Sequence, residues 1–274
     1  MELDLSDNAF GPAGAKPLMK LLVENRCIQI LKLNNNGLGI EGVRLISTAL
    51  VAAGEENTKE NRPSALKILQ MGRNRMESPG ASHLIKAFQA HSESLQEVRL
   101  YQNSIRPDVF PELMPVLAKC KGLQTLDLQD NTLTESGSIA LSESLPFWEN
   151  LTVLNIGECL LRSKGAIAVL KSLTLHLKME ELYLSFNEID TEAAALIPLM
   201  LENKAKIRVL ELNGNEFDPE GPTVIEIRRI LASHGHEDAL DELDEMEWED
   251  EDQEVSEVSE EDEELTSKIS ALKV

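Results

Sequence analysis

The apolar residues of this chain recur in a pattern with a period of about 28 residues. In the stretch LKLNNNGLGIEG (residues 31–42), apolar residues precede the last asparagine by five and three positions and follow it by two. Taking that asparagine as a marker, successive markers lie 28, 38, 29, 28, 28, 28 and 28 residues apart. The markers are Asn8, Asn36, Asn74, Asn103, Asn131, Cys159, Asn187 and Asn215. The alternation before each marker predicts a short strand, and the spacing after it predicts a helix.

One strand and one helix in every unit predict an α/β leucine-rich repeat solenoid of about eight 28-residue repeats, a ribonuclease-inhibitor-like horseshoe. We expect the parallel sheet on its inner side and the helices on its outer side. Residues 1–236 form this domain, with Val224, Ile225, Ile227, Ile230 and Leu231 in a closing helix that Gly235 ends. Residues 237–264 form an acidic tail, and 265–274 a short C-terminal segment. The interval of 38 predicts a polar loop insertion at residues 52–65.

The net charge of −22 resides mainly in the tail. Residues 237–264 contain 18 Asp or Glu and no Lys or Arg, which leaves about −4 for all other residues. This segment has too little apolar content to fold alone, although Leu243, Met246 and Trp248 are expected to dock its first part on the last repeat. The charge argues against binding to nucleic acid or anionic membranes. No apolar stretch approaches the roughly 20 residues that span a bilayer, so we expect a soluble intracellular protein.

The cysteines and histidines predict no chemistry of their own. Three cysteines without close pairing indicate a reducing compartment. Cys159 takes the marker position, and Cys27 and Cys120 are expected to be small packed residues. None of the histidines has metal-ligand spacing to Cys or to another His on one face, so no metal site is predicted. The histidines are His83, His91, His176, His234 and His236.

A dinucleotide-binding fingerprint is present only by coincidence. Gly37, Gly39 and Gly42 spell GxGxxG between a predicted strand and a predicted helix. The glycine six residues after the marker, however, recurs along the chain and therefore belongs to the start of the helices. Its equivalents are Gly14, Gly80, Gly137, Gly165 and Gly221.

The residues around each marker separate structure from candidate function. The marker asparagine points inward and bonds the backbone of adjacent turns, whereas Asn34 and Asn35 have no such explanation and should project from the strand end. The residue before each marker is polar in the first six repeats, apolar in the seventh and a glycine in the eighth. This row consists of Asp7, Asn35, Arg73, Gln102, Asp130, Glu158, Phe186 and Gly214. The row indicates either a polar contact surface or a solvated loop edge.

Seven stretches together resemble the Ran GTPase-activating protein family, from residue 1 to about residue 264. Their order and spacing are specific, although each alone would not be. They are LSDNAFGP (residues 5–12), NNGLG (35–39), GRNRME (72–77), NSIRP (103–107), LDLQDNT (126–132), LELNGN (210–215) and DELDEME (241–247). Family members carry about three further repeats before LSDNAFGP, with an arginine important for activity, and we expect this chain to lack them.

The resemblance implies a protein that binds Ran in its GTP form and stimulates hydrolysis in support of nucleocytoplasmic transport. No arginine finger is supplied. Instead, an asparagine matching Asn35 helps to orient Ran's own glutamine, so the chain is an activator without its own catalytic centre or cofactor, and GTP and Mg belong to Ran. The resemblance places Arg73, Arg75 and Asp130 at or near the partner interface. Further candidate partner-binding residues are Asp7, Asn34, Tyr101 and Arg106.

We also expect a monomer in a cytoplasmic or perinuclear location. The acidic tail would meet a basic patch on Ran or on a Ran-binding protein that binds with it. The alternative is a non-catalytic binding module of the ribonuclease-inhibitor type; such modules are rich in cysteine and alternate two repeat types. An acidic leucine-rich histone chaperone is a third reading, but its repeats are nearer 23 or 24 residues.

Overall fold

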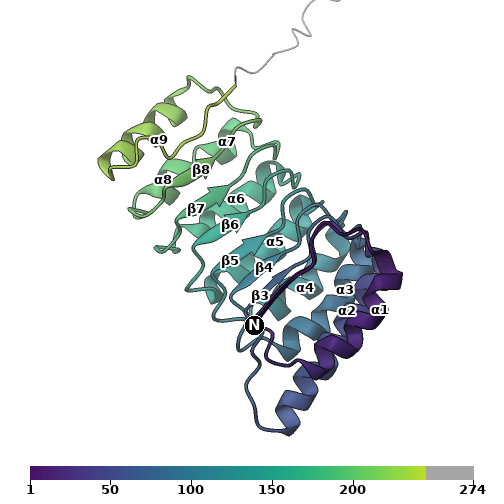
Figure 1. The fold of residues 1–274 in the computed structure, drawn as a ribbon. Coiled ribbons are helices and arrows are strands. Elements are labelled where there is room, and N and C mark those ends of the chain that lie inside the picture. Colours follow the sequence, from purple (N-terminus) through teal and green to yellow (C-terminus); the bar gives the residue numbers. More distant parts are fainter. Residues whose placement is uncertain (245–274) are drawn as a thin grey trace, which may run out of the picture.

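A computed structural model describes residues 1–244 as one curved array built on an eight-stranded parallel sheet (Figure 1). The strands follow one another in chain order, each paired with the next. They are β1 (Glu2–Asp4), β2 (Ile30–Lys32), β3 (Ile68–Gln70), β4 (Glu97–Arg99), β5 (Thr125–Asp127), β6 (Val153–Asn155), β7 (Glu181–Tyr183) and β8 (Val209–Glu211). The predicted leucine-rich repeat solenoid is confirmed.

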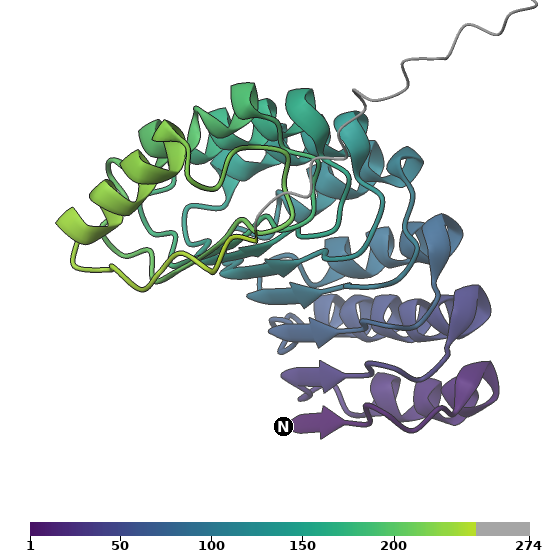
Figure 2. The same cartoon turned by 90° about the horizontal axis from the view of Figure 1, so that it is seen from above.

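Helices return the chain from each strand to the next and cover the outer side of the arc, while the strands line its inner side (Figure 2). The α-helices are α1 (Gly11–Glu24), α2 (Gly39–Lys59), α3 (Glu77–Ala90), α4 (Phe110–Leu117), α5 (Thr134–Ser144), α6 (Arg162–Leu173), α7 (Thr191–Ala194), α8 (Ile197–Leu201) and α9 (Pro222–Ser233). Two 3₁₀ turns, η1 (Pro107–Val109) and η2 (Leu145–Phe147), adjoin α4 and α5. In this described part, no helix has the length and apolar character that a membrane crossing requires.

The core is a stack of equivalent aliphatic side chains. The strand register aligns Leu31 with Leu69 and Leu69 with Val98, and all three are buried. At the first repeat, Leu3 and Leu5 are only half-buried. Because each layer packs only on its neighbours, the stability of such an array is approximately a sum of repeat and interface contributions.

The marker asparagines form the predicted ladder. Asn74 shows the pattern: its Oδ1 accepts from the backbone N–H of Asn36 (3.1 Å), and its Nδ2 donates to the carbonyls of Leu33 (2.9 Å) and Met71 (3.0 Å). Cys159 takes the same place, with its Sγ 3.3 Å from the carbonyl oxygen of Leu128. Burial raises the pKa of this thiol to about 12, so Cys159 is an unreactive packing residue.

A second row of polar side chains satisfies carbonyl groups at the ends of the helices. Trp148 Nε1 donates to the Leu117 carbonyl at 2.9 Å, and Lys204 Nζ donates to the Leu173 carbonyl at 2.6 Å. Leu117 and Leu173 are the last residues of α4 and α6, where backbone carbonyls have no partner within the helix. Lys204 is fully buried. Its ammonium group lies at the negative end of the α6 dipole, and no salt bridge within residues 1–244 involves it.

Replacing Lys204 with methionine is expected to raise the free energy of unfolding at pH 7 by about 2–3 kcal/mol. Burial lowers the pKa of Lys204 from 10.5 to about 8, so the folded state holds this proton less tightly than the unfolded state. Stability of the wild type should therefore rise between pH 8 and pH 10.5, and the advantage of the variant should shrink over that window. Denaturant titrations at pH 7 and pH 10 measure both effects. The exposed Lys206→Met is the control, and a destabilised Lys204→Met protein would contradict the expectation.

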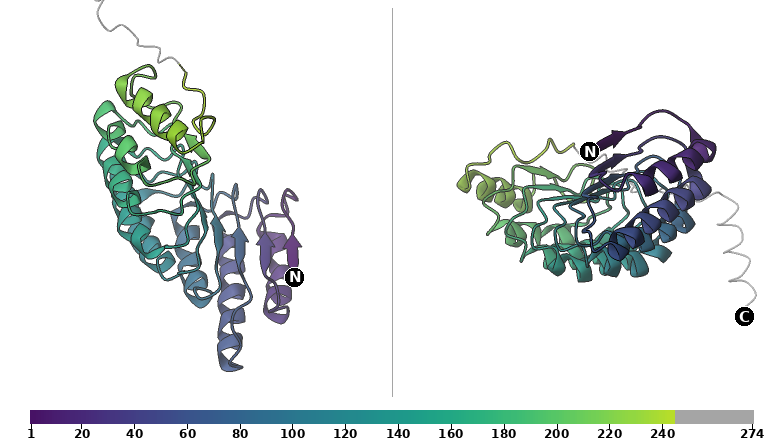
Figure 3. Two further views of the ribbon diagram at one scale, coloured as in Figure 1. Left: turned by 90° about the vertical axis from the view of Figure 1, so that its left-hand side faces the viewer. Right: turned by 60° about the horizontal axis from the view of Figure 1, so that its bottom comes forward.

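The predicted loop insertion at residues 52–65 is largely helical, so that prediction was wrong. Helix α2 continues to Lys59, and its last turns project beyond the neighbouring helices (Figure 3). The helix continues because Ala53 and Asn57 are buried on one face, while Lys59 pairs with Glu56 on the other at 2.6 Å. Only the remainder of the insertion, which contains Pro63, returns as irregular chain.

Three further expectations about side-chain burial were wrong. Cys27 is exposed rather than packed. In the closing helix α9, Ile225 is 64% exposed although the other four apolar residues are buried. The marker residue Asn8 is exposed, but its Nδ2 donates to the carbonyls of Leu5 (2.9 Å) and Ser6 (3.0 Å). Cys120, by contrast, is buried as predicted.

The first residues of the acidic segment complete the last repeat. Leu240 forms a parallel bridge with Leu210 of β8, and Leu243 packs against the core as predicted. The carboxylate of Asp241 accepts from the backbone N–H groups of Leu212 (2.9 Å) and Asn213 (3.0 Å). Residues 239–244 thus provide hydrogen-bond partners for the backbone groups at the edge of β8. Met246 and Trp248 lie outside the described residues.

Candidate functional site

The residue before each marker adopts the left-handed backbone conformation in all eight repeats. The φ angles run from 51° at Gln102 to 69° at Gly214. Asn, Asp and Gly tolerate this region best, whereas long side chains such as that of Arg73 (φ 56°) adopt it at a cost. The shared turn sends these side chains outward in a row at the carboxyl ends of the parallel strands. Such an edge is where α/β sheets usually bind their ligands.

Asp7 and Asn35 are joined within this row. Both are exposed and follow neighbouring strands, and Asn35 Nδ2 donates to Asp7 Oδ1 at 2.8 Å. The backbone contributes as well, because the N–H of Asn35 donates to the Gly72 carbonyl at 2.9 Å. The candidate catalytic residue is therefore fixed in place by the repeats on both sides.

Asn34 has structural partners that the sequence did not reveal, so the expectation that it lacks a structural role was wrong. Its Oδ1 accepts from the backbone N–H of Gly72 at 2.8 Å, and its Nδ2 donates to Gln70 Oε1 at 3.2 Å. Both partners belong to the next repeat, beyond the irregular interval of 38 residues. The hydrogen bonds of Asn34 join the second repeat to the third, whereas the adjacent Asn35 is exposed.

The next part of the edge carries arginines and an aromatic ring. Arg73 and Arg75 are exposed, and no ion pair involves either of them in residues 1–244. Tyr101 is half-buried with its ring against the backbone of Gly72, where an added Cβ would lie 2.3 Å from Cε1 of Tyr101. Burial, followed by the charge of Asp127, raises the pKa of Tyr101. The phenol therefore stays neutral and can donate or accept a hydrogen bond.

Arg106 and Asp130 lie on the same groove, one from the fourth repeat and one from the fifth. Both line a groove of about 520 Å³ together with Gln102 and Glu158. The backbone N–H of Arg106 donates to Ser78 Oγ at 3.0 Å, which holds the start of η1 on the third repeat. The groove thus combines one cation with two carboxylates at the same edge as Asn35.

The structure adds a charged cluster on the inner face that the sequence reasoning missed. Arg99 Nε donates to Glu97 Oε1 at 2.7 Å, and Arg99 Nη1 lies 3.3 Å from Asp127 Oδ2. Burial raises the pKa of Asp127, while the Gln129 N–H and Arg99 oppose the shift. The available signal was Glu97, a charged residue at the strand position where the preceding repeats carry Ile30 and Ile68.

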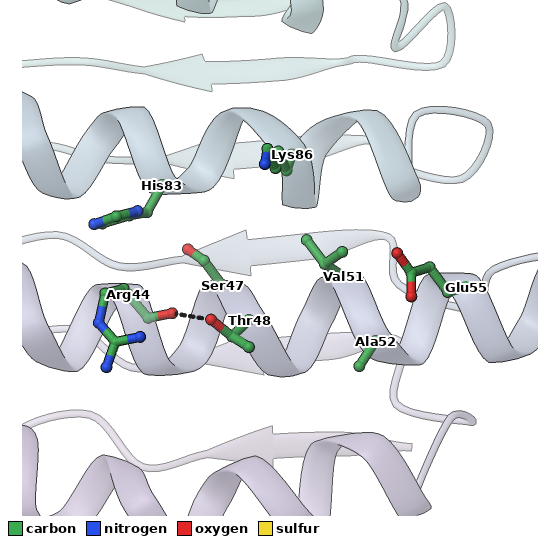
Figure 4. A pocket seen from close by; sticks show the side chains of 8 residues that line it. All are labelled: Arg44, Ser47, Thr48, Val51, Ala52, Glu55, His83 and Lys86. Atoms are coloured by element: carbon green, nitrogen blue, oxygen red, sulfur yellow. Dashed lines mark hydrogen bonds between the residues drawn. The ribbon is translucent and has the colours of Figure 1, made fainter.

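A separate groove of about 420 Å³ lies between α2 and α3 on the helical side. Its side chains largely serve the helices themselves: Thr48 Oγ1 donates to the Arg44 carbonyl at 2.8 Å (Figure 4), and Arg44 is held by Glu41 through two contacts of 2.7 Å. The residues that line this groove belong to α2 and α3 and not to the strand edge, so the groove is not part of the candidate site.

The closest hydroxyl–imidazole pair is structural. Ser64 Oγ lies 2.5 Å from Nδ1 of His91, and Nε2 of His91 contacts the Leu50 carbonyl at 2.9 Å. His91 is buried beside a cavity of only about 20 Å³, which leaves no room for a substrate, and burial lowers its pKa. The pair fastens the insertion to α2. Residues 1–244 also contain no group of three side chains positioned to hold a metal ion.

The glycine six residues after the marker serves packing. A Cβ on Gly42 would lie 2.9 Å from Cβ of Leu38, and one on Gly80 would lie 2.8 Å from Cβ of Met76. The apolar residue two positions after the marker fills that space in each case. This close approach explains the recurring glycine without a nucleotide.

Comparisons with known families agree with the architecture. The family described as "Leucine Rich repeat" matches residues 1–19, 24–47 and 119–142. Together with the eight-stranded parallel sheet and the asparagine ladder, this match defines the chain as a leucine-rich repeat protein.

The curated relatives that it matches include Ran GTPase-activating proteins from four organisms, in agreement with the resemblance drawn from the repeats. "Ran GTPase-activating protein 1" of Saccharomyces cerevisiae is 38% identical over 149 residues, covering 54% of this chain and 36% of the relative. The protein of the same name from Xenopus laevis is 44% identical over 106 residues, covering 38% of this chain and 18% of the relative. The matched part of the chain thus spans about a third or less of these relatives.

Among solved structures, "Leiomodin-1 Actin-Binding Site 2 (ABS2)" covers 68% of this chain and 95% of its own, at 10% identity and a TM-score of 0.46. A likeness of this degree supports no functional conclusion.

Proposed function

We propose that this chain activates the GTPase Ran, binding it in the GTP form and stimulating hydrolysis by orienting Ran's own catalytic glutamine. The similarity to Ran GTPase-activating proteins supports this function. The observation that carries it in the structure is Asn35, an exposed amide on a constrained backbone at the strand edge. Its buried neighbour Asn36 is occupied by the ladder.

The chemistry asked of Asn35 is positioning. A glutamine that must hold an attacking water gains from a neutral hydrogen-bonding group that restricts its rotamers. An amide supplies that contact without adding charge beside the phosphates. GTP and Mg²⁺ remain those of the partner, so the chain needs no cofactor and acts on the partner's active site.

The remaining edge residues are proposed to bind the partner. Arg73, Arg75 and Arg106 offer cations to carboxylates, and Asp130 offers an acceptor for a basic residue. Tyr101 adds a half-buried ring of the kind enriched at interface hot spots. Asp7 and Asn34 complete this surface at the first two repeats.

The experiment that tests the proposal compares partners directly. Immobilised 1–274 chain is presented with Ran loaded with GTP, Ran loaded with GDP, and ribonuclease. Retention of GTP-loaded Ran alone, followed by faster GTP hydrolysis in solution, supports the proposal. Retention of ribonuclease instead would favour a ribonuclease-inhibitor-like binding module, and binding of Ran without faster hydrolysis would reduce the chain to a binding module for Ran.

Deleting residues 245–274 is expected to weaken association with a basic partner more at low salt than at high salt. The deletion removes 13 of the 18 acidic residues of the tail while keeping the part that completes β8. Salt screens the interactions between exposed charges, with a screening length of about 10 Å at 0.1 M. Dissociation constants for Ran, with and without a Ran-binding protein, at 50 mM and 500 mM salt measure the effect. An equal loss at both concentrations would exclude an electrostatic role.

A further inference from the structure

The bond between Asp7 and Asn35 joins two members of the left-handed row. Asp7 (φ 62°) and Asn35 (φ 52°) occupy equivalent places in neighbouring repeats, with 2.8 Å between Asp7 Oδ1 and Asn35 Nδ2. In residues 1–244, no other two side chains of this row are hydrogen-bonded to each other. The first two repeats are therefore joined by a side-chain hydrogen bond within this row, which the later repeats lack.

The bond has only one possible direction. An ionised carboxylate has no proton to give, so the Asn35 amide must turn its NH₂ group toward Asp7. The carbonyl oxygen then points away from Asp7, and within the described residues no group donates to it. A lone asparagine at an exposed turn would be free to present either end of its amide.

The hydrogen bond between Asp7 and Asn35 also strengthens the Asn35 side-chain carbonyl oxygen as an acceptor. No Lys or Arg in the described part of the chain forms a salt bridge with Asp7. An amide that donates to a carboxylate becomes a better acceptor at its oxygen, because hydrogen bonds in a chain polarise one another. Asn35 should therefore be a selective acceptor for a donor such as a primary amide N–H.

We infer that Asp7 is a positioning residue: it locks the Asn35 amide so that the carbonyl oxygen faces the partner and accepts from the NH₂ group of the partner's glutamine. This inference rests on the proposed function. It leaves the glutamine's own carbonyl oxygen to accept from the attacking water. The reversed Asn35 amide would present NH₂ to NH₂ and could not make this contact.

Steady-state hydrolysis with GTP-loaded Ran as the substrate separates positioning from partner binding. Asp7→Ala should lower kcat about tenfold and should change KM by a smaller factor. Asp7→Asn keeps the left-handed preference but allows both amide directions, so its kcat should fall between those of the wild type and Asp7→Ala. Glu24→Gln removes one charge from the solvent face of α1 and is the control. An unchanged kcat, or a rise in KM alone, would overturn the inference.

A second readout does not depend on activity. In NMR spectra of the full chain, the side-chain NH₂ signals of Asn35 should shift when Asp7 is replaced by alanine and should stay in place in Glu24→Gln. Asn35 signals that ignore Asp7 would overturn the inference even in an active protein. A wild-type chain that fails to stimulate Ran but shows the coupled signals would refute the proposed function and leave the positioning pair standing.

Discussion

Replacing Asn35 with alanine or glycine is expected to cut the stimulated hydrolysis of GTP by Ran about 100-fold while leaving the array folded. The magnitude is that of removing one preorganised polar group from a catalytic site. Glycine is the sharper substitution, because at φ 52° it removes the side chain without the strain that alanine would add. Single-turnover GTP hydrolysis by Ran with saturating variant gives the rate.

The matched control for Asn35 is Phe186→Ala. Phe186 has the same left-handed backbone (φ 53°) in the seventh repeat and a side chain that is 55% exposed. It lies outside the polar part of the row, so its removal should leave the stimulated rate within about twofold. Equal losses in the two variants would mean that the turn geometry matters and the Asn35 amide does not.

Replacing the adjacent Asn36 with alanine should have the opposite profile, destabilising the array by about 2–3 kcal/mol. Asn36 is fully buried, and its Nδ2 donates to the carbonyls of Leu5 (2.8 Å) and Leu33 (3.0 Å). Its Oδ1 accepts from the backbone N–H of Asn8 at 3.0 Å, a donor that the substitution leaves without its partner. For a domain of this size the midpoint of thermal unfolding should fall by about 5–10 °C.

The comparison of Asn35→Gly with Asn36→Ala tests the register itself. Calorimetry should find the first variant within about 1 °C of the wild type and the second clearly lower. Equal melting of the two would place the ladder one residue away from where the structure has it.

The repeat register could be read from the sequence because every unit obeys the same geometry. A ladder residue must point inward and a strand alternates its faces, so one motif at Asn36 located the equivalents at Asn74 and Asn103. The same register indicated that Asn35 has no role in the asparagine ladder. Periodicity therefore predicted both the core and the row of side chains at its edge.

Features outside the period could not be read in this way. Asn34 bonds the backbone of Gly72 at 2.8 Å, across the one irregular interval, where sequence distance no longer gives spatial distance. The Gly54- and Pro63-containing insertion suggested a loop, but burial of Ala53 extends α2, as tertiary packing often overrides local propensity. The orientation of the Asn35 side-chain amide follows from its hydrogen bond to Asp7. The sequence pattern placed Asp7 beside Asn35 but did not predict that bond.

The most direct test of the account is single-turnover hydrolysis of GTP on Ran, with and without the 274-residue chain. The account predicts faster hydrolysis with the chain, the acceleration being lost in Asn35→Gly and retained in Phe186→Ala. Hydrolysis at the same rate with and without the folded chain would contradict it.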